Sequence, residues 1–197
     1  MPTPIPLQSA EIISTGKIVL LSGERQIGKS SLCFCLEEQL HQSNIEVSGI
    51  ITRRAGPHKL EVKELRTQTS YALTARHPSA DQNDLTLPNF QMDPDAMARG
   101  IAAIADSFPT DIFILDELGP LELLRGKGGH RALYLLKKAR YRLAFVVVRP
   151  ELLIEAMWQL PQISYTVITI TEENRDLLPE SLCNIAVEAC KPPIPFD

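Results

Sequence analysis

The sequence lacks the long apolar runs that membrane-spanning helices require. No stretch approaches the roughly 20 apolar residues that a helix needs to cross a bilayer. The opening residues, Met1 to Pro6, have neither the charged region nor the apolar centre of a secretory signal peptide. We therefore expect a cytoplasmic protein that is not inserted into a membrane.

Cysteine is scarce, and its spacing does not suggest a metal site. The four cysteines are Cys33, Cys35, Cys183 and Cys190, and no pair of them has the spacing of a zinc-binding motif. Cys33 and Cys35 are two residues apart on an expected helix, so they should point to different faces of it. We expect buried or unreactive thiols.

Basic residues are too few to suggest a protein that binds nucleic acid. The chain has 20 Lys and Arg against 24 Asp and Glu, a net charge of −4. No broad basic surface is expected, and nucleic acid is not an expected partner. The 197 residues, of which 44% are hydrophobic, are enough for one domain whose core needs neither disulfides nor a metal.

The most informative segment that is present is a phosphate-binding loop. Residues 23 to 31 fill every fixed position of the G-x-x-x-x-G-K-[ST] pattern, the Walker A motif. The glycines let the backbone curl around phosphate oxygens, and the following helix points its positive end at them. Lys29 should reach the β- and γ-phosphates, and the Ser30 hydroxyl should bind Mg²⁺. The predicted nucleotide-binding residues of this loop are Gly23, Glu24, Arg25, Gln26, Ile27, Gly28, Lys29, Ser30 and Ser31.

The flanks of the loop favour this interpretation over a chance match in an unrelated turn. Upstream, Lys17 to Leu21 is an apolar run typical of a buried parallel strand. Downstream, Leu32, Leu36 and Leu40 recur at four-residue spacing, as in a helix that packs on a sheet. Strand, glycine-bearing turn and helix therefore occur in the required order.

A phosphate-binding loop also needs a strand that ends in a carboxylate, because an oxygen ligand must hold Mg²⁺. Three later apolar runs compete for this role, at residues 112–115, 144–148 and 167–170. The first ends in Asp116 and Glu117. The second ends in Arg149 and Pro150 and offers no carboxylate. After the third, the carboxylate of Glu172 comes one residue too late.

These comparisons favour Asp116 as the carboxylate on the Mg²⁺ side. The metal ligands that we predict are therefore Ser30 and Asp116. Glu117, one residue further on, is then placed to polarise a water for attack on the γ-phosphate. Lys29 and Glu117 are the predicted catalytic residues.

The order of the expected elements indicates an α/β fold. We expect strands at 17–21, 46–52, 112–115, 143–148 and 164–170, and helices after the loop and at 94–108, 132–140, 150–159 and 178–189. Two alternating segments, at 59–66 and 71–75, predict an antiparallel hairpin insertion, and 77–93 should be irregular. The result is a mostly parallel sheet with helices on both faces and the ligand at the carboxyl ends of its strands. An irregular lead-in at 1–16, a single nucleotide-binding domain at 17–190 and a tail at 191–197 are expected.

Several segments together resemble one known family. The segment from Ile114 to Leu123 resembles the "DEIGKMEL" segment of the cancer-related nucleoside-triphosphatase family, a family of small P-loop NTPases. Residues 48–52 resemble its "GFYT" strand, and 171–176 its "NRD" segment. The resemblance runs from Lys17 to about Ala189. It implies a RecA-like or Rossmann-like sheet and slow, Mg²⁺-dependent hydrolysis of ATP, GTP and other nucleoside triphosphates. Gly119, in the first of these segments, joins the expected nucleotide-binding residues; the family's lysine at the next position is Pro120 here.

Other polar residues could assist this chemistry. Arg125, Lys127 and Arg131 lie soon after the Asp116 strand, and one of them could act as an internal arginine finger, although a solvated loop is the alternative. Arg53 and Arg54 follow another strand and could approach phosphate. Asn174 and Arg175 could contact the base or ribose. The chain has no N-K-x-D guanine signature, so the base preference stays open.

Three functions fit these motifs. The first is an Mg²⁺-dependent nucleoside-triphosphatase, a hydrolase that binds ATP or GTP. The second is a nucleotide-bound switch or assembly module, whose hydrolysis is incidental and whose output is the binding of a protein partner. The third is a small-molecule kinase, which would need an acceptor site and an arginine-rich lid; the short 125–131 segment is the only candidate for such a lid.

Overall fold

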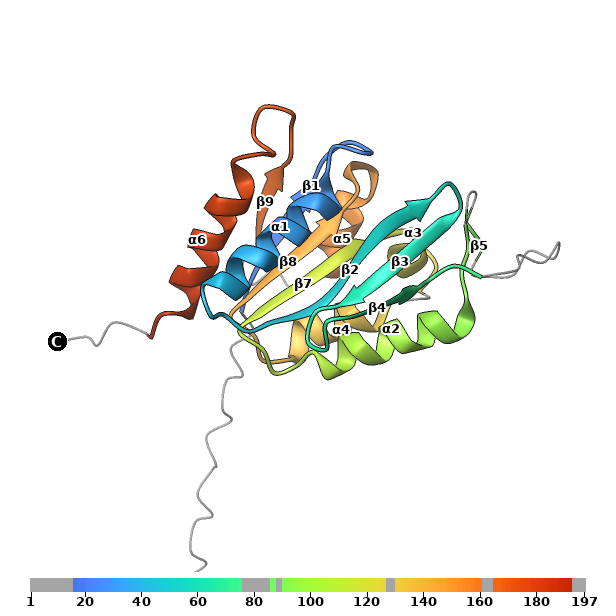
Figure 1. Cartoon of the computed structure of the whole chain (residues 1–197), viewed down its shortest axis with the longest axis horizontal. Helices are drawn as coiled ribbons and strands as arrows, with labels where there is room; N and C mark the ends of the chain where they lie inside the picture. Colours follow the sequence, from blue (N-terminus) through green and yellow to red (C-terminus); the bar gives the residue numbers. More distant parts are fainter. Residues whose placement is uncertain (1–15, 76–85, 88–89, 127–129, 161–164, 193–197) are drawn as a thin grey trace, which may run out of the picture.

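The computed structural model describes residues 16–75, 86–87, 90–126, 130–160 and 165–192. Most of the expected lead-in and tail lie outside these ranges, as does Lys127. Figure 1 shows the arrangement, a twisted sheet with helices in front of it and behind it. This is the α/β fold that the sequence predicts.

Seven strands form the main sheet, in the order β4-β3-β2-β7-β8-β1-β9. Five of them are parallel: β1 (Lys17–Ser22), β2 (Val47–Gly56), β7 (Ile112–Leu118), β8 (Leu143–Val148) and β9 (Tyr165–Thr169). The strands β3 (Lys59–Glu64) and β4 (Thr69–Ala72) add the expected antiparallel hairpin at one edge. The strand β8 therefore separates β1, which leads into the phosphate-binding loop, from β7, which carries Asp116 and Glu117.

The central strands are apolar on both sides because helices cover both faces of the sheet. In β1, Val19 and Leu21 belong to the core under one face, and Ile18 and Leu20 belong to the core under the other. One face is covered by α1 (Lys29–Gln42) and α6 (Leu178–Cys190). The opposite face is covered by α2 (Pro94–Asp106), α3 (Pro120–Leu123), α4 (Arg131–Lys138) and α5 (Leu153–Gln159).

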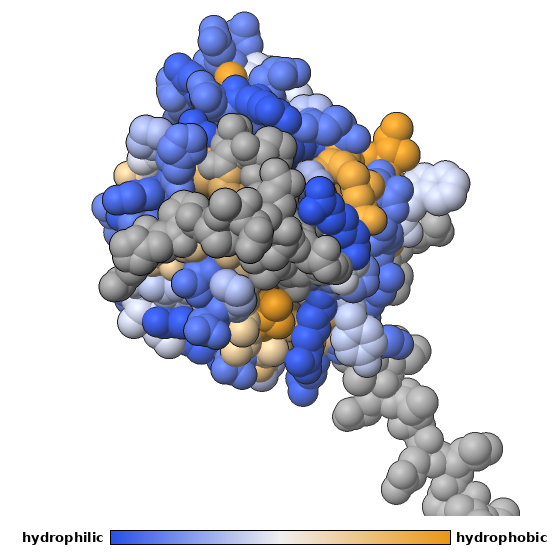
Figure 2. Space-filling view, turned by 90° about the vertical axis from the view of Figure 1, so that its right-hand side faces the viewer, coloured by the Kyte–Doolittle hydropathy of each residue, from blue (hydrophilic) through white to orange (hydrophobic). Residues whose placement is uncertain are grey.

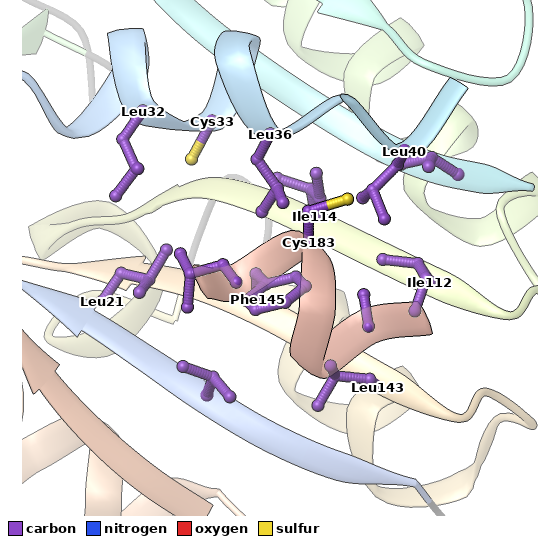
Figure 3. Close-up of a cluster of buried hydrophobic side chains, with 14 of the residues drawn as sticks. Leu21, Leu32, Cys33, Leu36, Leu40, Ile112, Ile114, Leu143, Phe145 and Cys183 are labelled. Atoms are coloured by element: carbon purple, nitrogen blue, oxygen red, sulfur yellow. The ribbon is translucent and has the colours of Figure 1, made fainter. Parts of the chain in front are cut away.

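The helix after the phosphate-binding loop is anchored to the sheet by its apolar stripe. Figure 3 shows Leu32, Cys33, Leu36 and Leu40 of α1 pointing toward the strands, with Cys183 of α6 beside them. Cys33 is buried and Cys35 is exposed, as the two-residue spacing predicts, and all four cysteines are free. This packing fixes the position of the first turn of α1, where the phosphates are expected to bind.

Two segments differ from the expected pattern. The segment 77–93, expected to be irregular, lies in part outside the described residues, but it contains two short paired strands, β5 (Thr86–Leu87) and β6 (Phe90–Gln91). The helix expected at 150–159 begins as a 3-10 turn, η2 (Pro150–Leu152), and continues as α5.

The described surface at the hairpin end of the molecule is mainly hydrophilic (Figure 2).

Candidate active site

The phosphate-binding loop connects β1 to α1 at the carboxyl edge of the sheet. Gly28 precedes the first residue of α1 and has a φ of 109°, a left-handed conformation that favours glycine. Residues 24 to 26 are exposed at the tip, and Ile27 packs against the core. The loop is therefore open to solvent on one side and anchored by an apolar contact on the other.

The Lys29 side chain lies across the phosphate-binding loop. Its Nζ donates to the carbonyl oxygen of Gly23 at 2.6 Å and to that of Glu24 at 2.7 Å. Burial lowers the pKa of Lys29, while the negative charges of Glu117 and Asp116 act in the opposite direction. The ammonium group is thus held inside the loop, within the field of both carboxylates at the end of β7.

Asp116 meets the loop directly. Its side chain is only 2% exposed, and the Ser30 hydroxyl and the backbone N–H of Thr52 lie near enough to the carboxyl to favour its ionised form. Burial, helped by the neighbouring charge of Glu117, raises the pKa of the Asp116 carboxyl to about 7 from its ordinary 3.8. Its Oδ2 atom is buried and has no hydrogen-bond partner among the described residues.

This arrangement suits a divalent cation. Mg²⁺ prefers hard oxygen ligands and usually takes one or two from the protein, with the rest from phosphates and water. Ser30 and Asp116 supply two such oxygens at one point, and the unpartnered Oδ2 atom has a buried lone pair to offer. In the described part of the chain no three His, Cys, Asp or Glu side chains gather around a common point, so phosphate and water oxygens would have to complete the shell.

Glu117 is bound by an arginine that no motif in the sequence singles out. Arg149, the residue directly after β8, donates from Nε to Oε1 of Glu117 at 2.6 Å. Both side chains are about one quarter exposed, 28% for Arg149 and 26% for Glu117. Gly119 lies next to the same carboxylate, because a Cβ atom at Gly119 would be 3.7 Å from Oε1 of Glu117. Glu117 is therefore ordered at the edge of the site and accessible to water.

Arg53 and Arg54, which the sequence suggests could approach phosphate, contact other groups. Arg53 donates to Glu61 of β3 with an Nη2 to Oε2 distance of 2.9 Å, and the Arg54 guanidinium lies 5.3 Å from the ring centre of Phe90. Both residues belong to the extended end of β2 and not to a loop over the site.

Of the other candidates, Asn174 and Arg175 bond to groups away from the carboxylates at the end of β7. Arg125 and Arg131 are exposed, and each belongs to the segment around α3 and α4. The Asn174 side chain donates to the carbonyl oxygen of Thr169 at 2.9 Å and accepts from the N–H of Thr171 at 2.8 Å. Arg175 is exposed, with its Nε 3.7 Å from Oδ1 of Asp176. Asn174 therefore orders the turn after β9, which is the neighbour of β1 in the sheet.

Comparison with known proteins identifies the family. A family model described as NTPase matches residues 18–183. The chain belongs to the NTPase family. This agrees with the resemblance to small P-loop NTPases seen in the sequence, and with the position of the phosphate-binding loop inside the matched range.

Structural comparison supports the same fold for this NTPase family member. The crystal structure of THEP1 from the hyperthermophile Aquifex aeolicus is similar with a TM-score of 0.68 and 12% sequence identity, over 86% of this chain and 98% of that chain. A comparison with curated proteins gave no match. Within the described residues, no helix is both long and apolar enough to span a membrane.

Proposed function

We propose that the protein hydrolyses nucleoside triphosphates, ATP and GTP among them, to the diphosphate and phosphate in an Mg²⁺-dependent reaction. The observation that supports this most directly is the proximity of the Ser30 hydroxyl to the buried Asp116 carboxyl. It brings together the phosphate-binding loop and the acidic strand end, two segments far apart in the sequence. Membership of the NTPase family supports the general class of the reaction.

The loop residues would bind the triphosphate. The backbone N–H groups at the start of α1 point toward the loop and favour anions. Lys29 would exchange its contacts with the Gly23 and Glu24 carbonyls for contacts with the β- and γ-phosphates. Ser30 and Asp116 would hold Mg²⁺, which when bound neutralises charge on the phosphate oxygens.

Glu117 would handle the proton of the attacking water. The water oxygen forms a bond to the γ-phosphorus while the bond to the bridging oxygen breaks, and the diphosphate leaves with that electron pair. The Glu117 carboxylate accepts a proton from the attacking water and later passes it to the inorganic phosphate that is formed. A quarter-exposed carboxylate beside the buried Asp116 combines access to water with proximity to the proposed metal site.

Little discrimination between adenine and guanine is expected. The chain has no N-K-x-D segment, and Asn174, one of the residues proposed near the base, already uses both ends of its amide on the backbone. Arg175, exposed beside it, is the better candidate for a contact with base or ribose.

The proposal is tested by measuring nucleotide binding and phosphate release in parallel on the wild type and on Glu117→Gln. Glutamine keeps the size of the side chain and can still accept from Arg149, but it cannot accept a proton. Turnover should therefore fall by a factor on the order of 10² to 10⁴ while Mg²⁺·ATP binds as before. Glu38→Gln makes the same change at an exposed position of α1 and should alter neither quantity.

Three other outcomes would lead to different conclusions. Phosphate release that survives in Glu117→Gln would show that Glu117 is not the base. Tight binding without release in the wild type would favour the switch or assembly module. Transfer of phosphate only when a small-molecule acceptor is added would favour a kinase.

A further inference from the structure

Arg149 lies between the two parts of the candidate site, the phosphate-binding loop after β1 and the carboxylates at the end of β7. It follows β8 directly, and β8 lies between β1 and β7 in the sheet. Its backbone is fixed on both sides: Val148 before it is buried, and its carbonyl oxygen accepts from the N–H of Leu152 at 3.0 Å in the η2 turn. The side chain therefore starts from a rigid point at the carboxyl edge of the sheet.

The contact with Glu117 uses only part of the guanidinium group. Nε donates to Oε1 of Glu117 at 2.6 Å, while a guanidinium has five N–H donors. Among the described residues, Nη1 and Nη2 of Arg149 make no hydrogen bond, although the Glu151 carboxylate two residues further on also lies within the field of the guanidinium. Since the side chain is 28% exposed, these donors can receive an anion that enters from solvent.

Arg149 also lies within the field of the phosphate-binding lysine. Lys29 begins α1 directly after the loop that follows β1, and Arg149 follows β8, the strand that pairs with β1. Two cations thus face the same region from neighbouring strands, one after β1 and one after β8. Such a pair, with Mg²⁺, suits the concentrated negative charge at the γ end of a triphosphate.

We propose that Arg149 is a further catalytic residue, which holds the Glu117 carboxylate in the empty protein and binds the γ-phosphate in the triphosphate complex. This inference rests on the proposed hydrolysis. A γ-phosphate carries more charge than one carboxylate and accepts two parallel N–H bonds from an arginine, so it can draw the guanidinium away from Glu117. Glu117 is then free to accept the proton of the attacking water, and the same guanidinium stabilises the charge of the transition state.

No other arginine discussed above combines these properties. Arg25 in the loop is exposed and lies 3.5 Å from Glu151, and Arg53 is bonded to Glu61 on the hairpin. Among the ion pairs of the described residues, the Arg149 pair alone includes Asp116 or Glu117. The geometry therefore assigns the role of internal arginine finger to Arg149.

The test compares triphosphate and diphosphate affinities, which do not depend on turnover. Mg²⁺·ATP and Mg²⁺·ADP are titrated calorimetrically into the wild type, Arg149→Ala, Arg149→Lys, Glu117→Gln and the double variant Glu117→Gln/Arg149→Ala. Loss of Arg149 should weaken ATP binding about tenfold or more and leave ADP binding nearly unchanged, because only ATP has the γ-phosphate. Turnover of Arg149→Ala should fall on the order of 10²- to 10³-fold, with partial recovery in Arg149→Lys.

The double variant separates direct contact from an indirect effect. In Arg149→Ala the unpaired Glu117 charge could repel ATP by itself, but Glu117→Gln removes that charge. The selective loss of ATP affinity should therefore persist in the double variant. An unchanged ratio of ATP to ADP affinity in that background would overturn the proposal and reduce Arg149 to a residue that positions Glu117.

A matched control is available on the same strand. Arg142 precedes β8 at the opposite end and forms a similar pair, from Nε to Oδ1 of Asp111 at 2.8 Å. Arg142→Ala should change neither affinity nor turnover, and thermal unfolding of each variant checks that the fold persists. If the wild type and Arg142→Ala bind ATP but release no phosphate, the proposed hydrolysis fails, while the affinity ratios still decide whether Arg149 contacts the γ-phosphate.

Discussion

Replacement of Asp116 by asparagine should stabilise the nucleotide-free protein at neutral pH and abolish its response to Mg²⁺. The wild-type carboxyl is 2% exposed, and burial raises its pKa to about 7 from the ordinary 3.8. A difference of that size corresponds to a free energy on the order of 4 kcal/mol for ionising the buried group. Asparagine keeps the shape of the side chain and has no charge to bury.

The direction in which the free energy of unfolding changes with pH follows from the protons that the folded and unfolded states bind. Between about pH 4 and pH 7 the folded wild type holds a proton on Asp116 that the unfolded chain has lost. The contribution of Asp116 to the free energy of unfolding therefore falls as the pH rises through this window, and it is constant above it. In the variant this contribution is absent. Its amide would place an N–H donor without a partner near the position of Oδ2, at a cost of about 1–3 kcal/mol, so the net gain at pH 8 should be roughly 1–3 kcal/mol.

The measurement is urea unfolding of both proteins at intervals from pH 4.5 to pH 8.5. The difference between the two curves isolates Asp116, because the pKa values of other acids, such as Glu37 and Glu64, are lowered and affect both proteins alike. The free energy difference should grow with pH and level off above about pH 7. Parallel curves would refute the reasoning, because they would mean that the folded protein does not hold this proton.

Addition of Mg²⁺ and ATP should reverse the order of stability. A ligand that binds only the folded protein stabilises it in proportion to the logarithm of its concentration over Kd. The wild type, with Asp116 available to the metal, should gain several degrees in Tm from Mg²⁺·ATP beyond the gain from ATP with a chelator. Asp116→Asn should show little difference between these two conditions, and an equal response of both proteins would assign the metal to another carboxylate, such as Glu172.

Most of the fold follows from local pattern. The apolar runs of β1, β7 and β8 predict buried strands because their residues must fill cores on both faces of the sheet. The Asp93-Pro94 pair predicts the start of α2, and the Asp93 carboxylate indeed accepts from the N–H groups of Asp95 and Ala96. In contrast, α3 has four residues, too few for a helical period to show in the sequence.

The site could be predicted only where a motif contained it. The contact between Ser30 and Asp116 joins two recognisable motifs. The sequence does not single out Arg149, because its strand ends without a carboxylate and because its place at the site depends on β8 lying between β1 and β7 in the folded sheet. Arg53 follows an apolar run and so has the pattern of a residue just after a strand, but β2 continues through it. The alternating pattern of β3 places Glu61 opposite Arg53 across the hairpin, and that cross-strand pairing was the missed signal.

Two further substitutions separate the chemistry of the site from the framework that carries it. Lys29→Ala should weaken ATP binding at least about tenfold, or ~1.4 kcal/mol, yet leave urea unfolding almost unchanged, because Nζ bonds only to loop carbonyls; calorimetric binding at wild-type strength would contradict the loop assignment. Gly49→Ala should lower the free energy of unfolding by about 3 kcal/mol or more, because Gly49 has a φ of 113° and an added Cβ would lie 1.9 Å from the carbonyl oxygen of Ile114 on β7. Gly56→Ala, on the same strand, would bring its Cβ no nearer than 3.7 Å to Lys59 and should cost far less. Equal losses of unfolding free energy in the two glycine variants would mean that the close approach at Gly49 does not determine how β2 packs against β7. Other contacts would then set the distance between β7, which carries Asp116, and the phosphate-binding loop.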